Sequence, residues 1–151
     1  MNCENITITN ASSDDLQAIL DLLSQVQLPH DGVAENLSDF LVARDESRLI
    51  ATIGIERHGD TALLRSAAVA PEYQGCGIGS RLTEQLLERA TNNGTERVVL
   101  LTSTASEFFA RRFGFCETSR TAFDKELAAS PEWNLPRCSS AVCMTLDLRN
   151  E

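Results

Sequence analysis

The positions of apolar and polar residues along the first half of the chain predict short strands and one helix. Apolar and polar side chains alternate over residues 6–9, as in a strand, and apolar residues at 16, 19, 20, 23 and 26 follow the spacing of one helix face. Ser12 and Asp15 resemble a capping box at the start of that helix. Residues 40–43, 49–55 and 61–70 are predicted strands, separated by turns at 45–47 and 58–60. Consecutive antiparallel strands follow from this order.

The second half of the chain alternates between helix and strand patterns. A glycine-rich stretch at 75–79 leads into a segment whose apolar positions 78, 82, 86 and 90 lie on one helix face, and Asn93-Gly94 ends it. Residues 98–101 are continuously apolar, which is typical of a strand buried on both faces. A short helix over 106–112 ends at Gly114, and further strands are predicted at 115–118 and 141–146.

The strand–helix–strand order around the glycines also predicts how two strands run. A helix that connects two strands of one sheet makes a right-handed crossover, so the strands at 61–70 and 96–102 should be parallel. The 151 residues suffice for one compact domain and are too few for two ordinary ones. We therefore expect a single α/β domain over residues 1–151, mixed in the α+β sense, with a mostly antiparallel twisted sheet flanked by helices.

Composition and charge narrow the classes of partner. Thirteen basic and 22 acidic residues give a formal charge of −9, which disfavours nucleic-acid binding because such binding neutralises phosphates with Lys and Arg. No stretch approaches the roughly 20 apolar residues of a membrane span, and the first residues lack the features of a signal peptide. The five cysteines show no zinc-ligand spacing. We expect reduced thiols, no metal and a cytoplasmic location.

Residues 69–82 carry the strongest functional signal in the chain. A strand-like stretch ends at Pro71, passes glycines at 75, 77 and 79, and enters a helix. Glycines let an anion approach backbone N–H groups, and the first turn of a helix leaves such groups unpaired at its positive end. The pattern predicts a phosphate-binding loop. It matches neither the dinucleotide fingerprint G-x-G-x-x-G nor a P-loop, and a tight turn without a ligand is the remaining alternative.

Gln74-x-x-Gly77-x-Gly79 resembles the acyl-coenzyme-A pyrophosphate motif [QR]-x-x-G-x-[GA] of the GNAT N-acetyltransferase superfamily. The order of the predicted elements agrees with that family, and residues 109–115, FARRFGF, stand where the family has F-Y-x-x-x-G-F. The resemblance covers nearly the whole chain. Segments at 54–56, 62–66, 100–105 and 138–144 are most similar to the small arsenic-resistance-associated branch, and glutamate-type amino-acid acetyltransferases share part of the pattern.

The resemblance implies where acetyl-coenzyme A (acetyl-CoA) would bind. The two parallel strands would splay apart at their C-terminal ends, and the pantetheine arm would pair with the backbone there. A backbone N–H near Val69 would stabilise the oxyanion that develops on the thioester, which makes Val69 a catalytic position. The pyrophosphate would rest on the N–H groups of the glycine loop. The implied cofactor-binding residues are Ala67, Ala68, Val69, Gln74, Gly75, Cys76, Gly77, Ile78, Gly79, Ser80, Arg81, Thr102, Phe109 and Arg112. Cys76 is either a reactive thiol or a tolerated small residue.

The expected reaction is direct attack of an uncharged amine on acetyl-CoA, which needs a base for the ammonium proton. In many relatives a Glu in the strand before the loop is that base, but Leu63 stands at its position. Glu56, near the end of the preceding strand, is the predicted substitute. The alternative is that Glu56 is a solvated hairpin residue and His58 a polar residue beside the turn. The family's usual general acid, a Tyr, is replaced by Ala110.

Arg65 is predicted to bind the acidic end of the substrate. Strand alternation places it on one face with residues 63, 67 and 69, where an arginine is costly unless it meets an anion. Its planar guanidinium suits a carboxylate, phosphinate or arsonate. An internal salt bridge is an alternative of nearly equal weight. Thr102 and Ser103 are further candidates for substrate contact, with helix capping as their alternative.

These expectations define one leading function and two alternatives. The leading function is acetylation of the primary amine of a small, acidic, amino-acid-like molecule, with a role in arsenic resistance under the narrower resemblance. The alternatives are a catalytically weak acyl-CoA sensor and a protein or peptide N-acetyltransferase. Family habit suggests a homodimer. The segment 131–140, with Trp133, would cover the substrate pocket, form a dimer contact or pack in the core.

Overall fold

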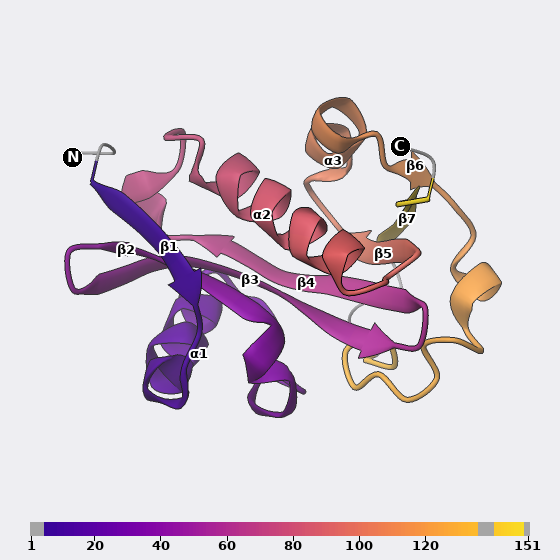
Figure 1. Cartoon of the computed structure of the whole chain (residues 1–151), viewed down its shortest axis with the longest axis horizontal. Helices are drawn as coiled ribbons and strands as arrows, with labels where there is room; N and C mark the ends of the chain where they lie inside the picture. The colour runs from indigo at the N-terminus through magenta and orange to yellow at the C-terminus, as the bar shows by residue number, and fades with distance from the viewer. Residues whose placement is uncertain (1–4, 136–140, 150–151) are drawn as a thin grey trace. The chain divides into compact units, whose positions relative to one another are not determined.

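The structure is a computed structural model that describes residues 5–135 and 141–149 (Figure 1). The strands are β1 (Ile6–Asn10), β2 (Phe40–Asp45), β3 (Arg48–His58), β4 (Thr61–Val69), β5 (Arg97–Thr102), β6 (Cys116–Glu117) and β7 (Val142–Asp147). The helices are α1 (Leu16–Gln25), α2 (Ile78–Asn92) and α3 (Ser106–Phe113), and short 3-10 helices lie at η1 (Ser13–Asp15), η2 (Ala34–Asp39), η3 (Pro71–Tyr73) and η4 (Arg120–Phe123). None of the described helices is long and apolar enough to cross a membrane.

The described strands form one seven-stranded sheet in the order β1-β2-β3-β4-β5-β7-β6. β1 with β2, β2 with β3, β5 with β7 and β6 with β7 are antiparallel, whereas β4 and β5 are parallel. The helix between these two parallel strands is α2. The predicted α/β fold, with a mostly antiparallel sheet, one parallel pair and flanking helices, is confirmed.

Several element boundaries differ from the sequence prediction. The strand predicted at 49–55 runs from Arg48 to His58, and the strand predicted at 115–118 is reduced to Cys116–Glu117. The apolar pattern does not predict the 3-10 helices, because such short pieces show no full helical period. The predicted helix ends are confirmed, since Gly94 and Gly114 follow α2 and α3 with φ angles of 86° and 78° in the left-handed region.

Contacts within the chain divide it into two compact units. The first consists of Met1–Ile55 and Ser66–Glu88, and the second of Glu56–Arg65 and Arg89–Glu151. The glycine-rich loop therefore lies in the first unit. Glu56 and Arg65 both lie in the second.

The core of the first unit contains a tight contact between two strands. Phe40 in β2 is paired with Gly54 in β3, and Phe40 is fully buried. A Cβ atom at Gly54 would lie 2.4 Å from the Phe40 ring. The ring thus occupies the space that a side chain at position 54 would need, and glycine is required there by close packing.

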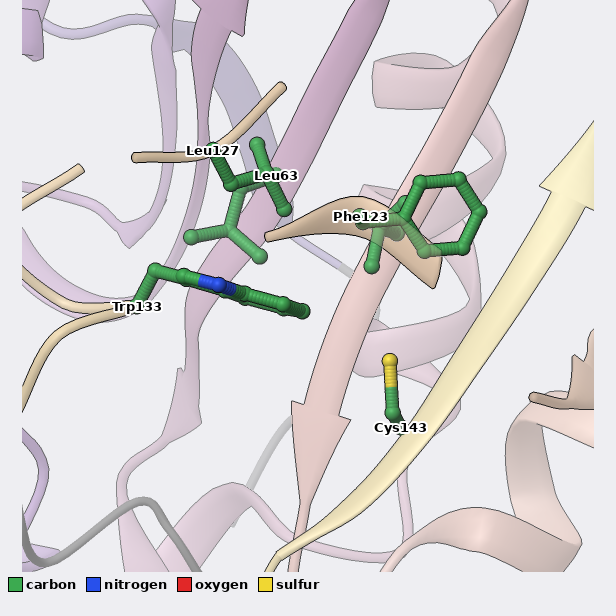
Figure 2. Packing of buried hydrophobic residues seen from close by; sticks show 6 residues of the cluster. Leu63, Phe123, Leu127, Trp133 and Cys143 are labelled. Carbon is green, nitrogen blue, oxygen red and sulfur yellow. The ribbon is translucent and has the colours of Figure 1, made fainter. Parts of the chain in front are cut away.

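The core of the second unit is a cluster of buried side chains from the sheet and the segment 119–135. Its members are Leu63, Val99, Phe123, Leu127, Trp133 and Cys143. Figure 2 shows the indole ring of Trp133 pointing into this cluster. Trp133 is only 1% exposed, so core packing is the role that the structure gives it. Of the segment 131–140, residues 136–140 lie outside the described residues.

β4 has an irregularity in its second half. Ser66 has a φ of 59°, in the left-handed region that residues with a Cβ seldom adopt. Such a residue interrupts the regular alternation of a strand, as in a bulge. The expected alternation of residues 63, 65, 67 and 69 on one face is therefore not regular: Leu63 and Arg65 are buried, Ala67 is exposed and Val69 is half-buried. The parallel register pairs Thr61–Leu64 with Arg97–Leu100, whereas β4 continues to Val69.

Candidate active site

The glycine loop between β4 and α2 has the backbone geometry of an anion-binding turn. Gly75 and Gly77 have φ angles of 89° and 78°, which L side chains rarely adopt. A Cβ at either position would have no heavy atom within 4 Å, so the space beside the backbone is open. α2 begins directly afterwards at Ile78, and the first turn of a helix presents N–H groups without intrahelical acceptors. The open space and these N–H groups together fit a phosphate.

Side chains of the first unit hold the loop at both ends. Nε2 of Gln74 donates a hydrogen bond to the carbonyl oxygen of Val69 at 3.1 Å, which ties the loop back to the end of β4. Oγ1 of Thr83 donates to the carbonyl oxygen of Gly79 at 2.8 Å, inside the first turns of α2. Gln74, predicted from the motif as a cofactor-binding residue, thus orders the loop through its side chain.

The 3-10 turn before the loop is anchored by β2 and β3. The hydroxyl of Tyr73 donates a hydrogen bond to the Asp45 carboxylate, and this bond raises the pKa of Tyr73 above its usual value. Glu72 forms an ion pair with Arg48, with Nη2 2.7 Å from Oε2, and Arg48 lowers the pKa of that carboxyl group. These contacts fix the point at which the chain leaves β4 and enters the glycine loop.

The cysteines differ from the sequence expectation. Cys76 is disulfide-bonded, so the expectation of reduced thiols throughout is wrong at this position. Cys116 and Cys143 are free, the first exposed and the second buried. Within the described ranges, no group of three or more His, Cys, Asp or Glu residues could hold a metal ion.

The other predicted cofactor-binding residues of the first unit lie around the loop. Ala67 is exposed, Ala68 is buried and Val69 is half-buried at the end of β4. Ile78 is buried, whereas Cys76, Gly79 and Ser80 are accessible. Nη2 of Arg81 lies 3.5 Å from the carbonyl oxygen of Ile6, so part of its guanidinium faces the start of β1.

The predicted site residues of the second unit lie at the end of β5 and in α3. Oγ1 of Thr102 accepts a hydrogen bond from the backbone N–H of Ala105 at 2.9 Å in the turn before α3, and Ser103 is exposed. Phe109 is 5% exposed and packs edge-to-face on Phe115, with ring centroids 5.5 Å apart. Arg112 is exposed at the C-terminal end of α3.

A buried network of charged residues lies in the second unit. Nη1 of Arg65 is 2.6 Å from Oε2 of Glu56, and the two side chains are 0% and 1% exposed. The other oxygen of Glu56 lies 3.0 Å from Nε2 of His58, whose side chain is 16% exposed. Nε of Arg65 lies 3.6 Å from Oε1 of Glu132, which is 8% exposed. We call Glu56, His58, Arg65 and Glu132 the charged cluster.

The charged cluster shows the surroundings of Glu56 and Arg65 and adds two residues, His58 and Glu132. Glu56 is buried, so it is not a solvated hairpin residue. Arg65 forms internal ion pairs, which was one of its two predicted roles, and its contact with a substrate anion stays a prediction. His58 and Glu132 were not predicted as functional residues. For His58 a signal existed, because residues 56 and 58 lie on the same side of a strand, but nothing local connects Glu132 with β3 or β4.

The position of the usual family base is apolar in structure as well as in sequence. Leu63 is fully buried and packs in the cluster with Leu127 and Trp133 (Figure 2). A carboxylate at this position would be surrounded by apolar side chains and would lose its hydration without compensation. The nearest buried carboxylate on the adjacent strand of the same unit is Glu56, which has ionic partners.

Comparison with known families identifies the fold and the loop. Residues 8–115 match the sequence model of the Acetyltransferase (GNAT) family. The chain belongs to this family. The matched region contains the glycine loop as well as Glu56, His58 and Arg65, whereas Glu132 lies beyond it. The GNAT prediction from the motif at 74–79 is thereby confirmed, and the family is one of acetyl-transferring enzymes.

Individual acetyltransferases are also similar to this chain in sequence or in fold. The N-alpha-acetyltransferase 30 of Schizosaccharomyces pombe is 33% identical over 87 residues, which cover 52% of this chain and 58% of that protein. The Amino-acid acetyltransferase of Pseudomonas fluorescens is 26% identical over 114 residues, 70% of this chain and 26% of that protein. The chain therefore spans only part of the length of these relatives. Rv2747 from Mycobacterium tuberculosis, solved in complex with CoA and NLQ, has the same fold, with a TM-score of 0.77, 23% identity, and coverage of 94% of this chain and 99% of that one.

Proposed function

We propose that this GNAT protein transfers the acetyl group of acetyl-CoA to the primary amine of a small, acidic, amino-acid-like molecule. The observation that carries the proposal is the glycine loop, in which Gly75 and Gly77 adopt positive φ angles beside open space directly before α2. This geometry suits a pyrophosphate, and the chain belongs to the acetyltransferase family. An amino-acid-like acceptor is supported by the similarity to an Amino-acid acetyltransferase.

In this proposal the end of β4 and the glycine loop hold the donor. The backbone N–H groups from Gln74 to Ser80 bind the pyrophosphate, and the backbone of Ala67 to Val69 pairs with the pantetheine arm. The Val69 N–H donates to the thioester carbonyl, where negative charge develops during attack. When bound, acetyl-CoA supplies an activated acetyl group whose thiolate leaves readily, since a thiol has a pKa near 8.5. Arg81, Thr102, Phe109 and Arg112 remain proposed cofactor contacts.

Glu56 supplies the acid–base chemistry in this proposal. An amine must lose a proton before it can attack, and Glu56 is the proposed acceptor, directly or through water. Its ion pair with Arg65 fixes the carboxylate in one orientation, with Nη1 2.6 Å from Oε2. Arg65 is also the proposed ligand for the acidic group of the substrate. A substrate anion would replace Glu132 as a partner of Arg65. Oε1 of Glu132 lies 3.6 Å from Nε of Arg65, whereas Oε2 of Glu56 lies only 2.6 Å from Nη1.

Release of free CoA from acetyl-CoA, measured by chromatography, tests this function. The acceptor panel contains acidic and neutral amino acids, polyamines, aminoglycosides, and amino-phosphinate and amino-arsenical analogues, of which the last examines the resemblance to the arsenic-resistance branch. We expect amine-dependent CoA release and an N-acetylated product in the mass spectrum for an acidic amino acid or its analogue. CoA binding without turnover of any amine would instead identify a sensor.

A second candidate function is acetylation of the α-amino group of a peptide. It is favoured by the similarity to an N-alpha-acetyltransferase of Schizosaccharomyces pombe. Short peptides with free and with blocked N-termini in the same assay separate the two functions. Turnover of free-amine peptides, with none of amino acids, would replace the leading proposal by this one.

A further inference from the structure

The charged cluster has an unbalanced formal charge. Ionised Glu56 and Glu132 contribute two negative charges and Arg65 one positive charge, so the cluster carries −1 while His58 is neutral. Buried charges are costly unless they are compensated. One added proton, on Glu56 or on His58, makes the cluster neutral. Among these four residues, a proton accepted from a substrate ammonium therefore lowers the magnitude of the net charge.

The members of the cluster differ in their access to solvent. The Glu56 side chain is 1% exposed, and its two oxygens face His58 at 3.0 Å and Arg65 at 2.6 Å. The side chain of Arg65 is 0% exposed. Glu132 lies on the Nε side of Arg65. Among the described contacts of Glu56, His58 is the titratable neighbour that reaches solvent, with 16% of its side chain exposed.

We propose that His58 carries to solvent the proton that Glu56 takes from the substrate amine. This inference rests on the proposed acetyl transfer and names a residue that the sequence reading left without a role. The proton leaves the amine nitrogen, whose lone pair becomes available for attack, and forms an O–H bond on Glu56. When His58 carries its proton on Nδ1, Nε2 has a free lone pair and takes the proton from that oxygen. The imidazolium then loses its Nδ1 proton to water or buffer, and tautomerisation through solvent returns the remaining proton to Nδ1. Glu56 returns to its ionised form, and no oxidation or reduction occurs.

Arg65 and Glu132 are positioning residues in this relay. Arg65 holds one oxygen of Glu56, which leaves the other oxygen directed at His58. The carboxylate of Glu132 lies 3.6 Å from Nε of Arg65, so its negative charge stabilises the guanidinium on the side away from Glu56. A protonated His58 and ionised Glu56 attract each other, so the relay keeps the two groups in contact during proton transfer.

His58→Gln and His58→Ala test the relay in the full-length protein at low buffer concentration. Gln can donate a hydrogen bond to Glu56 but cannot carry a proton, so it preserves a structural role and removes the relay. We expect kcat to fall on the order of 10²-fold in both variants, at the lower end of the contribution of a positioned acid–base group. The Kd of CoA should stay unchanged. Imidazole added to His58→Ala should restore part of kcat.

The matched control is His30→Gln. His30 is the other histidine of the chain, is exposed and lies 2.8 Å from the Ser24 hydroxyl in α1. This variant should keep kcat and show no response to imidazole. Glu56→Gln should lose kcat without rescue, because added imidazole does not replace a buried carboxylate.

The outcomes separate this inference from the proposed function. Amine-dependent CoA release by the unaltered chain tests acetyl transfer alone. If that activity is present and His58→Gln keeps its kcat, the relay is wrong while the function stands. A loss of kcat in His58→Ala that imidazole does not restore, in a variant with an unchanged thermal unfolding midpoint, also overturns the relay.

Discussion

Arg65 and Glu56 form a buried ion pair across neighbouring strands, with Nη1 of Arg65 2.6 Å from Oε2 of Glu56 and neither side chain more than 1% exposed. Burial removes the hydration of both ions, and this cost is offset only while each has its partner. The same ion pair therefore stabilises the fold and orients Glu56, the proposed base. Its effect on the free energy of unfolding and its effect on catalysis can be measured separately.

Arg65→Met should destabilise the fold strongly. The substitution replaces the apolar stem of the side chain by one of similar size but leaves Glu56 and Glu132 without the guanidinium. Removal of one partner of a buried pair costs about 3–5 kcal/mol, and we expect a loss of this size in urea unfolding. Arg111→Met is the control, because Arg111 pairs with Glu107 at the surface, where the side chains are 79% and 72% exposed. Equal stability changes in both variants would contradict the assignment of a buried network.

Gly77→Ala should weaken CoA binding. The φ of 78° at Gly77 strains any residue with a Cβ, at about 1–2 kcal/mol, and a methyl group would project into the open space beside the loop. The control is Gly94→Ala, because Gly94 has a φ of 86° and open surroundings after α2. Both variants should lose similar stability in thermal unfolding, but calorimetry should show a higher Kd for CoA in Gly77→Ala only. Unchanged CoA affinity in Gly77→Ala would argue against the loop as the pyrophosphate site.

Gly54→Ala should destabilise the first unit through overpacking. The added Cβ would lie 2.4 Å from the Phe40 ring, which is fully buried and has no room to move outward. Overpacking of a buried site costs about 1–3 kcal/mol. Phe40→Leu combined with Gly54→Ala should recover part of the loss, because Leu leaves space for the methyl group. A double variant less stable than the sum of the two single changes would contradict this explanation.

Cys116 and Cys143 should differ in thiol reactivity. Burial raises the pKa of the Cys143 thiol from an ordinary value of 9.0 to about 11, so almost none of it is thiolate at neutral pH. Cys116 is free and exposed. Iodoacetamide at pH 8 followed by peptide mass mapping should show modification of Cys116 in the folded protein, and of Cys143 only after unfolding.

The same thiol predicts a pH dependence of stability. The unfolded chain begins to lose the Cys143 proton near pH 9, whereas the folded protein keeps it until about pH 11. Between these values the unfolded state binds fewer protons, so the free energy of unfolding should fall as the pH rises. Urea unfolding at a series of pH values should show a shallower decline for Cys143→Ala than for the unaltered protein. Parallel declines would show that another group is responsible.

Trp133 should report on the integrity of the second unit. It is the single tryptophan of the chain and is 1% exposed, so its emission should be blue-shifted and resist quenching by acrylamide. Its Nε1 donates to Oδ1 of Asp124 at 3.1 Å, and the Arg120 guanidinium lies 4.6 Å from the ring centroid. Trp133→Phe should cost about 0.5–3 kcal/mol, because the smaller ring leaves a void in the buried cluster. A red-shifted emission in the folded protein would contradict the packing in Figure 2.

Much of the fold could be predicted because it depends on local patterns. Residues 78, 82, 86 and 90 repeat at helical spacing and are all buried in α2, and Gly94 ends that helix with a positive φ. The glycine loop is also a local signal, since Gly75 and Gly77 adopt the conformation for which glycine is favoured. The alternation of β4 was predicted less well. Its irregularity at Ser66 depends on the surrounding sheet, and serine carries no sequence signal for a positive φ.

By itself, the sequence determined the order of strands and helices, the parallel direction of β4 and β5, and the GNAT family with its glycine loop, because each depends on neighbouring residues and their spacing. Only the tertiary structure decided the environment of the residues that would act on the acceptor. It placed Glu132, from the segment after η4, beside Arg65, and Trp133 beside Leu63. Contacts between residues so distant in sequence depend on the path of the chain, and no local pattern encodes that path.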